Sequence, residues 1–371
     1  MRYDDAHHTP VQSSGRARFA WLLGSGVPPT TAVPNHGEFA AACEFALDAW
    51  QVLPAIAPGL FAWGGPRLAA TAEAARVRDR VTGLLVLARL QLVLTRRLVD
   101  ALTRERIPYA LLKGSAVRIV AYDSPLHRCG KDLDVAVSGE HVRAAEDAAV
   151  SCGFLPAEWN ATDKTFAPAD AGLRAAVERR HYELGFLVRR QAVRDLEPEE
   201  EAAIRRDLPS QYIWHVTPND RLACYVSVDV HHGLSLEIPV DPVIEAAEDA
   251  GTGDERLRVA PLEWLLFHAV YKTYWEGVTN YRKGGYQLAD VARLLARLDA
   301  PGFARFTGLL ADHRLEVAGH YVLRRLPSDL GIPLTPEADA FVVETSAPPS
   351  DNDPLEWNDL GDMWPKLWGT R

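Results

Sequence analysis

The most informative stretch of the sequence runs from Leu111 to Val137 and reads LLKGSAVRIVAYDSPLHRCGKDLDVAV. The apolar run from Ile107 to Leu112 predicts a buried strand that ends at Gly114-Ser115. A helix-sized segment follows, and a second strand then carries Asp132 and Asp134 between apolar neighbours. Because side chains alternate faces along a strand, the two carboxylates are expected to project to the same side.

A carboxylate pair of this kind calls for a cation. Two carboxylates held a few ångströms apart repel each other unless positive charge lies between them. Mg²⁺ prefers oxygen ligands and commonly uses one or two carboxylates together with substrate phosphates. The pair therefore predicts a Mg²⁺ site, although an Asp-x-Asp pair alone is more often an exposed strand face or a turn.

The motif as a whole resembles the polymerase-beta-like nucleotidyltransferases, whose signature is an apolar residue, Gly, Gly or Ser, and later Asp-apolar-Asp. Within them it is most similar to a bacterial branch described as uncharacterised nucleotidyltransferases, and residues 116–131 form the long gap of that branch. The matching positions are Leu112, Lys113, Gly114, Tyr122, Pro125, Arg128, Asp132 and Asp134. The resemblance implies an α+β fold, with a polymerase-beta-like sheet, flanking helices and a C-terminal helical domain.

A third acidic residue follows in the run ACYVSVDVH, which predicts a strand from Ala223 to His231. Asp229 lies between Val228 and Val230, and an acidic residue is unexpected in a buried strand. It looks like the third carboxylate of the superfamily, although a buried aspartate in an ion pair is the simpler alternative. His231 shares its face, and we interpret that histidine first as a structural residue with a satisfied ring.

The resemblance implies transfer of a nucleoside monophosphate from a nucleoside triphosphate, with two Mg²⁺ ions held by Asp132, Asp134 and Asp229. Asp229 could take the proton of the attacking hydroxyl. Backbone N–H groups at Gly114 and Ser115 could approach the triphosphate closely. The remaining candidates for nucleotide contacts are the basic residues Lys113, Arg128, Lys131 and Lys272.

Composition narrows the possible partners of the protein. The 371 residues carry a formal net charge of −10, which disfavours a large nucleic-acid interface because such interfaces need clustered Lys and Arg. The four cysteines form no Cys-x-x-Cys pair, so neither a zinc site nor a disulfide framework is indicated. We expect a cytoplasmic protein without a membrane segment, acting on a small molecule or a peptide.

Breaks in the pattern suggest five parts. These are a flexible leader (1–35), an N-terminal helical region (36–106), the catalytic domain (107–259), a C-terminal helical domain (260–345) and an irregular acidic tail rich in Trp (346–371).

Three functions remain open at this stage. The first is Mg²⁺-dependent transfer of AMP from ATP to a hydroxyl of a small molecule or peptide, in a setting such as secondary metabolism. The second is nucleotidylation of a macromolecule by a regulator or toxin. The third is a binding or scaffold protein that has kept the fold without turnover.

Overall fold

A computed structural model describes residues 34–160, 165–170, 172, 181–208, 213–251, 257–275, 285–330 and 332–345. The expected tail (346–371), and the expected leader apart from Pro34 and Asn35, lie outside these ranges. The chain divides into two compact units: residues 1–81 together with 266–371, and residues 82–265. The two unit boundaries fall within the helices α4 (Ala72–Arg104) and α10 (Leu262–Trp275).

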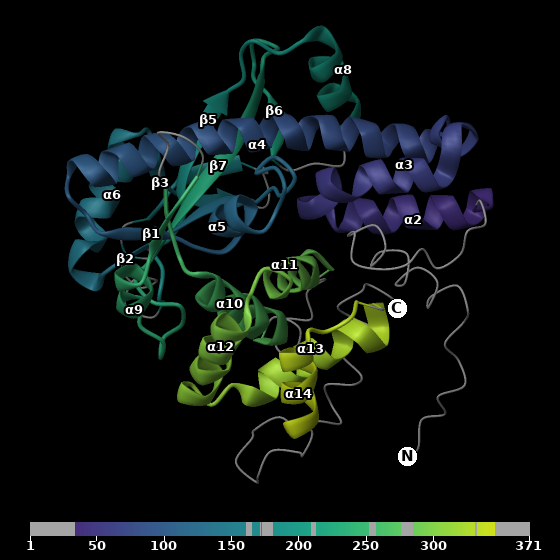
Figure 1. Ribbon diagram of the computed structural model, residues 1–371. Coiled ribbons are helices and arrows are strands. Elements are labelled where there is room, and N and C mark those ends of the chain that lie inside the picture. The colour runs from purple at the N-terminus through teal and green to yellow at the C-terminus, as the bar shows by residue number, and fades with distance from the viewer. Residues whose placement is uncertain are drawn as a thin grey trace. The chain divides into compact units, whose positions relative to one another are not determined.

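The unit of residues 82–265 is built on one nine-stranded mixed sheet in the order β4-β3-β5-β7-β2-β1-β9-β8, with β6 also pairing with β7 (Figure 1). The pairs β2/β7 and β1/β9 are parallel, and the others are antiparallel. The strands are β1 (Tyr109–Leu111), β2 (Asp132–Val137), β3 (Leu155–Asn160), β4 (Thr165–Pro168), β5 (Leu187–Ala192), β6 (Trp214–Val216), β7 (Leu222–His231), β8 (Glu248–Ala250) and β9 (Leu257–Val259).

Helices flank this sheet, as the α+β prediction requires. They are α5 (Lys113–Val120), η3 (Gly139–His141), α6 (Val142–Ser151), α8 (Pro198–Asp207) and α9 (Asp241–Glu245), together with the part of α4 in this unit. Alternate residues of β7, from Cys224 to Val230, are apolar and buried, and they form the core under the helices. The α+β class is thus confirmed.

The segment between α5 and β2 is anchored to α4 by polar contacts. Gln91 Nε2 donates to Gly130 O at 2.8 Å, and the buried Arg118 side chain donates to Gln91 Oε1 and to Pro125 O. The sequence pattern suggested a helix-sized segment here, but α5 ends at Val120 and a loop continues to β2. Pro125 and Gly130 explain this difference, because neither residue favours the interior of a helix.

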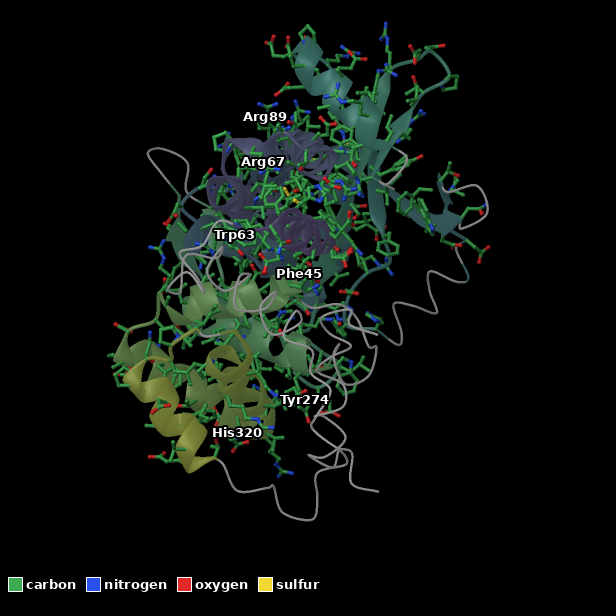
Figure 2. All side chains as sticks on the ribbon, turned by 90° about the vertical axis from the view of Figure 1, so that its right-hand side faces the viewer. Phe45, Trp63, Arg67, Arg89, Tyr274 and His320 are labelled. Carbon is green, nitrogen blue, oxygen red and sulfur yellow. The ribbon has the colours of Figure 1, made fainter. Side chains whose placement is uncertain are left out.

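The other unit is helical throughout its described residues. Its elements are α2 (His36–Asp48), η2 (Trp50–Val52), α3 (Leu53–Ala69), α11 (Gly285–Leu295), α12 (Ala300–Asp312), α13 (Glu316–Leu330) and α14 (Pro336–Glu344). Helices α2 and α3, which carry Phe45 and Trp63, lie side by side (Figure 2). The rings of Tyr274 on α10 and Tyr321 on α13 meet edge to face, with 5.7 Å between their centroids.

Among the described residues, no single helix has the length and apolar composition needed to cross a membrane. One pair in the described ranges, α2 taken together with Trp50–Ala69, passes such a test, and that pair is bent by 93°.

Candidate active site

Three carboxylates meet where the parallel strands β2 and β7 run side by side. The pairing places Asp134 opposite Asp229, and Asp132 opposite Ser227. Since paired residues on neighbouring strands project to the same face, all three acidic side chains share one side of the sheet. Apolar alternation explains why: Leu133 and Val135 occupy the core face of β2, which leaves the aspartates on the other.

Burial makes these carboxylates electrostatically costly. Asp134 is 2% exposed and Asp229 is 7% exposed. Desolvation, followed by the neighbouring Asp132, raises the pKa of Asp229 well above its ordinary value. Desolvation and the charge of Asp134 likewise raise the pKa of Asp132. The Oδ1 atom of Asp229 is buried, and no donor among the described residues reaches it. Asp132 lies close enough to hydrogen-bond with Asp229, but two ionised carboxylates have no proton to share, so this bond forms only when one of the two is protonated. The cluster therefore carries more negative charge than the surrounding protein neutralises, as expected of a site that binds a cation.

Lys113 supplies part of the missing positive charge. Its Nζ atom lies 2.8 Å from Asp134 Oδ1 and 3.9 Å from Glu183 Oε2. Burial alone would lower the pKa of this ammonium group, but the surrounding carboxylates, led by Asp134, raise it well above its ordinary value. Lys113 adopts a backbone φ of 44°, a left-handed conformation that residues other than glycine seldom take. The turn between β1 and α5 thus combines strained backbone with the ion pair.

The start of α5 is tied directly to the Asp-x-Asp strand. The backbone N–H of Asp134 donates to Ser115 Oγ at 2.9 Å, and the N–H of Leu112 donates to Asp134 O at 3.1 Å. The buried Arg128 guanidinium lies behind this turn, where it donates to Cys129 O. A Cβ atom added to Gly114 would meet that guanidinium at 3.5 Å, which is an ordinary contact. Packing within the described protein therefore does not explain why this position is glycine.

A histidine completes the donor set. One ligand atom each from Asp134, Asp229 and His231 lies within 4.8 Å of the others. His231 Nε2 is 3.1 Å from Asp134 Oδ1, and its Nδ1 is 3.3 Å from Glu183 Oε2. These residues form a possible metal-binding group, with Asp132 on the same face.

Comparison with known protein families places this chain. The model of a family described as uncharacterised nucleotidyltransferase matches residues 46–328. The chain belongs to this family. No curated protein matches it. The nucleotidyltransferase match confirms the resemblance inferred from the Leu111–Val137 stretch, and it identifies the chain as a member of a transferase family with the expected fold.

The sequence interpretation of this nucleotidyltransferase missed Glu183. It lies before β5, and an isolated antiparallel bridge joins it to His231. HYELGFLVRR, residues 181–190, alternates like one strand, yet β5 begins only at Leu187. The register shifts by one residue between the bridge and the strand. An acidic residue between Tyr182 and Leu184 was the available signal, and it is the same signal that singled out Asp229.

The predicted nucleotide contacts lie in three places. Lys113, Gly114, Ser115 and Arg128 gather around the start of α5. Lys131 is an exposed neighbour of Asp132, and its carbonyl accepts a weak bond from Ser227 Oγ at 3.4 Å. Lys272 lies on α10, in the helical unit. For all six residues, the role as a nucleotide contact stays a prediction.

Proposed function

We propose that this nucleotidyltransferase moves AMP from ATP onto a hydroxyl of a small molecule or peptide, with Mg²⁺ bound at the three carboxylates. One observation carries the proposal: Asp134 faces Asp229 across two parallel strands, with Asp132 on the same face and the start of α5 hydrogen-bonded to the same strand.

The chemistry of the donor set fits a hard divalent cation. Carboxylate oxygens dominate it, and the buried Oδ1 of Asp229 faces no protein donor in the described chain. When bound, Mg²⁺ would neutralise charge on the phosphates and lower the pKa of the acceptor hydroxyl. In our proposal Asp132, Asp134 and Asp229 hold the metal, and two ions are expected.

The chain's own residues then position the reactants. Gly114 and Ser115 let the backbone approach the triphosphate at the first turn of α5, which accounts for the glycine that packing leaves unexplained. Lys113 places its ammonium group beside the same site, where it is paired with Asp134 and can contact phosphate oxygens. Most of the catalytic effect in phosphoryl chemistry comes from such positioning and charge neutralisation.

The proposed reaction is a single in-line displacement. The acceptor oxygen forms a bond to the α-phosphorus, and the bond from that phosphorus to the bridging oxygen of the β-phosphate breaks. Asp229 takes the hydroxyl proton, and pyrophosphate leaves with the bonding electron pair. The products are the adenylylated acceptor, pyrophosphate and a proton.

The acidic cluster disfavours a scaffold without turnover. Burial and mutual repulsion raise the pKa values of Asp132 and Asp229 although Lys113 lies beside them, so keeping all the carboxylates ionised costs stability that a bound cation would recover. Nucleotidylation of a macromolecule uses the same chemistry and differs only in the acceptor.

Calorimetric titration with each of the four nucleoside triphosphates and Mg²⁺ tests the proposal. The wild type should bind one of them, ATP most tightly, and the double variant Asp132→Asn/Asp134→Asn should not. Asp220→Asn is the matched control, because Asp220 is an exposed loop carboxylate paired with Arg205. Equal binding by the wild type and the double variant, or no binding by either, would refute the proposed site.

A further inference from the structure

A strip of apolar and aromatic side chains is exposed on the sheet beside the candidate site. We name this set the aromatic strip; it consists of Leu155, Trp159, Phe166, Phe186 and Tyr225. Phe166 is central, with ring centroids 5.1 Å from Trp159, 6.2 Å from Phe186 and 5.1 Å from Tyr225. Leu155 is 59% exposed, Phe186 48% and Trp159 37%. Contiguous exposed apolar surface of this kind commonly marks a binding site.

The strip lies on the same face of the sheet as the carboxylates. Tyr225 and Asp229 are four residues apart on β7, so their side chains project to the same side. Ser227, between them, pairs with Val188 of β5, which in turn pairs with Leu155 of β3. Paired residues share a face, so β3 continues the same surface. At about 3.3 Å per residue, Tyr225 is roughly 13 Å from Asp229 along the strand.

The position of the strip relative to α5 decides which reactant it can serve. In the sheet order β5-β7-β2-β1, α5 follows β1, and Ser115 at its start is bonded to β2. The strip extends away from α5: it begins with Tyr225 on β7, the strand of Asp229, continues at Phe186 just before β5, and reaches β3 and β4. In an in-line displacement, the leaving pyrophosphate and the attacking oxygen occupy opposite sides of the phosphorus. With the triphosphate at α5, the acceptor approaches from the side of the strip.

Contacts with His215 and Arg190 hold Tyr225, the strip residue on β7, in place. The His215 ring stacks on Tyr225, with 4.4 Å between centroids, and Arg190 Nε donates to His215 Nε2 at 2.8 Å. Arg190 is also the cross-strand partner of Tyr225. A ring fixed in this way loses little conformational entropy when a partner binds, which favours its use as a contact surface.

We infer that the aromatic strip binds a polypeptide acceptor that carries an aromatic side chain three or four residues from the hydroxyl that receives AMP. Small-molecule sites are concave and enclose most of their ligand, whereas the strip is open, with large exposed fractions. Exposed Trp, Tyr and Phe are typical of surfaces that bind proteins and peptides. Three to four residues of extended chain span roughly 10 to 13 Å, which matches the distance from Tyr225 to Asp229. This inference rests on the proposed function and narrows its acceptor.

Two blocked hexapeptides test the inference with the full-length chain. One has the sequence Ser-Gly-Gly-Phe-Phe-Gly, and the other has glycine in place of both phenylalanines. We expect saturation-transfer NMR to show tighter binding of the aromatic peptide by wild type, by about tenfold, and faster pyrophosphate release when MgATP is present. Phe186→Ala/Trp159→Ala should remove this preference. Val93→Ala/Val150→Ala, which trims two other exposed apolar residues, should keep it.

Calorimetry with MgATP on the same variants separates the two proposals. The strip variant should bind MgATP as wild type does, so absent MgATP binding by wild type would count against the proposed function itself. If wild type binds MgATP but prefers neither peptide, or if the strip variant keeps the preference, the inference is overturned. The inference is also overturned if phenylalaninamide competes as well as the aromatic peptide, since the strip would then bind a small aromatic molecule. If light scattering shows that the wild type self-associates and the strip variant does not, the strip binds a second copy of the chain and the inference is again overturned.

Discussion

The two faces of strand β7 carry side chains of opposite character. On one face, Cys224, Val226, Val228 and Val230 are apolar and at most 1% exposed. On the other, Tyr225, Ser227, Asp229 and His231 follow one another, from a half-buried aromatic ring to a buried cluster of charges. Successive residues of a single strand thus supply the core and the candidate chemistry.

The comparison shows that burial has opposite effects on stability on the two faces. Burial of the valines contributes to stability through the hydrophobic effect. Burial of Asp229 costs stability, and its raised pKa is the sign of that cost. The stability gained on the core face allows the other face to hold carboxylates that Lys113 neutralises only in part.

The largest effect is expected at the carboxylate face, where Asp134→Asn should reduce nucleotidyl transfer on the order of 10³-fold. The asparagine has the same shape but lacks the charge that holds the cation and the Lys113 ammonium. The measurement is pyrophosphate release with MgATP and the acceptor. Circular dichroism should show an unchanged fold, and turnover above one tenth of wild type would show that the carboxylate face is not the catalytic one.

On the core face, Val228→Ala should lower the free energy of unfolding by about 2 kcal/mol, because it removes two methyl groups from a fully buried position and leaves a cavity. Urea denaturation of the wild type and the variant gives this difference. Val216→Ala on β6 is the control, since Val216 is 42% exposed and its loss should matter little. Equal effects at the two positions would contradict the assignment of the core face.

Asp229→Asn should have the opposite sign, raising the stability of the metal-free protein by about 1 kcal/mol. Between the ordinary aspartate pKa and the raised value in the fold, the unfolded chain has released its proton while the folded chain retains it. The wild type therefore loses stability as pH rises through this window, and the variant lacks the contribution of Asp229 to this loss.

Thermal melts with and without Mg²⁺ check this expectation. The gain from Asp229→Asn should be larger at pH 8 than at pH 5, and the Mg²⁺-induced rise in melting temperature should shrink in the variant. A gain that is the same at both pH values would show that repulsion at Asp229 is not its source.

The smallest effect is expected away from both faces, at the exposed ion pair between Arg89 on α4 and Glu200 on α8 (Figure 2). Arg89→Ala should change the free energy of unfolding by less than about 0.5 kcal/mol, because solvent screens such pairs. Urea denaturation measures it, and MgATP binding should not change. A loss of unfolding free energy close to that of Val228→Ala would show that the Arg89–Glu200 pair contributes as much to stability as a buried valine.

Sequence reasoning found the three acidic residues for a physical reason. Alternation along β2 and β7 is a local property, so an aspartate between two valines or leucines already indicates a polar side chain beside a buried face. Glu183 in HYELGF also lies between apolar residues. The pairing register with β7 shifts by one residue between Glu183 and β5, and such a shift moves side chains to the other face of the sheet. Simple alternation along the segment therefore does not predict which face Glu183 occupies.

Local sequence patterns were enough to predict the family, the α+β class and the strands that carry Asp132, Asp134 and Asp229. The folded chain was needed to show that Asp134 lies opposite Asp229, that Lys113 and His231 both contact Asp134 Oδ1, and that the aromatic strip continues the same face. His231 and Asp134 are 97 residues apart in the chain. No local preference of the backbone sets such a contact; it follows from strand pairing, which the burial of the whole sheet selects.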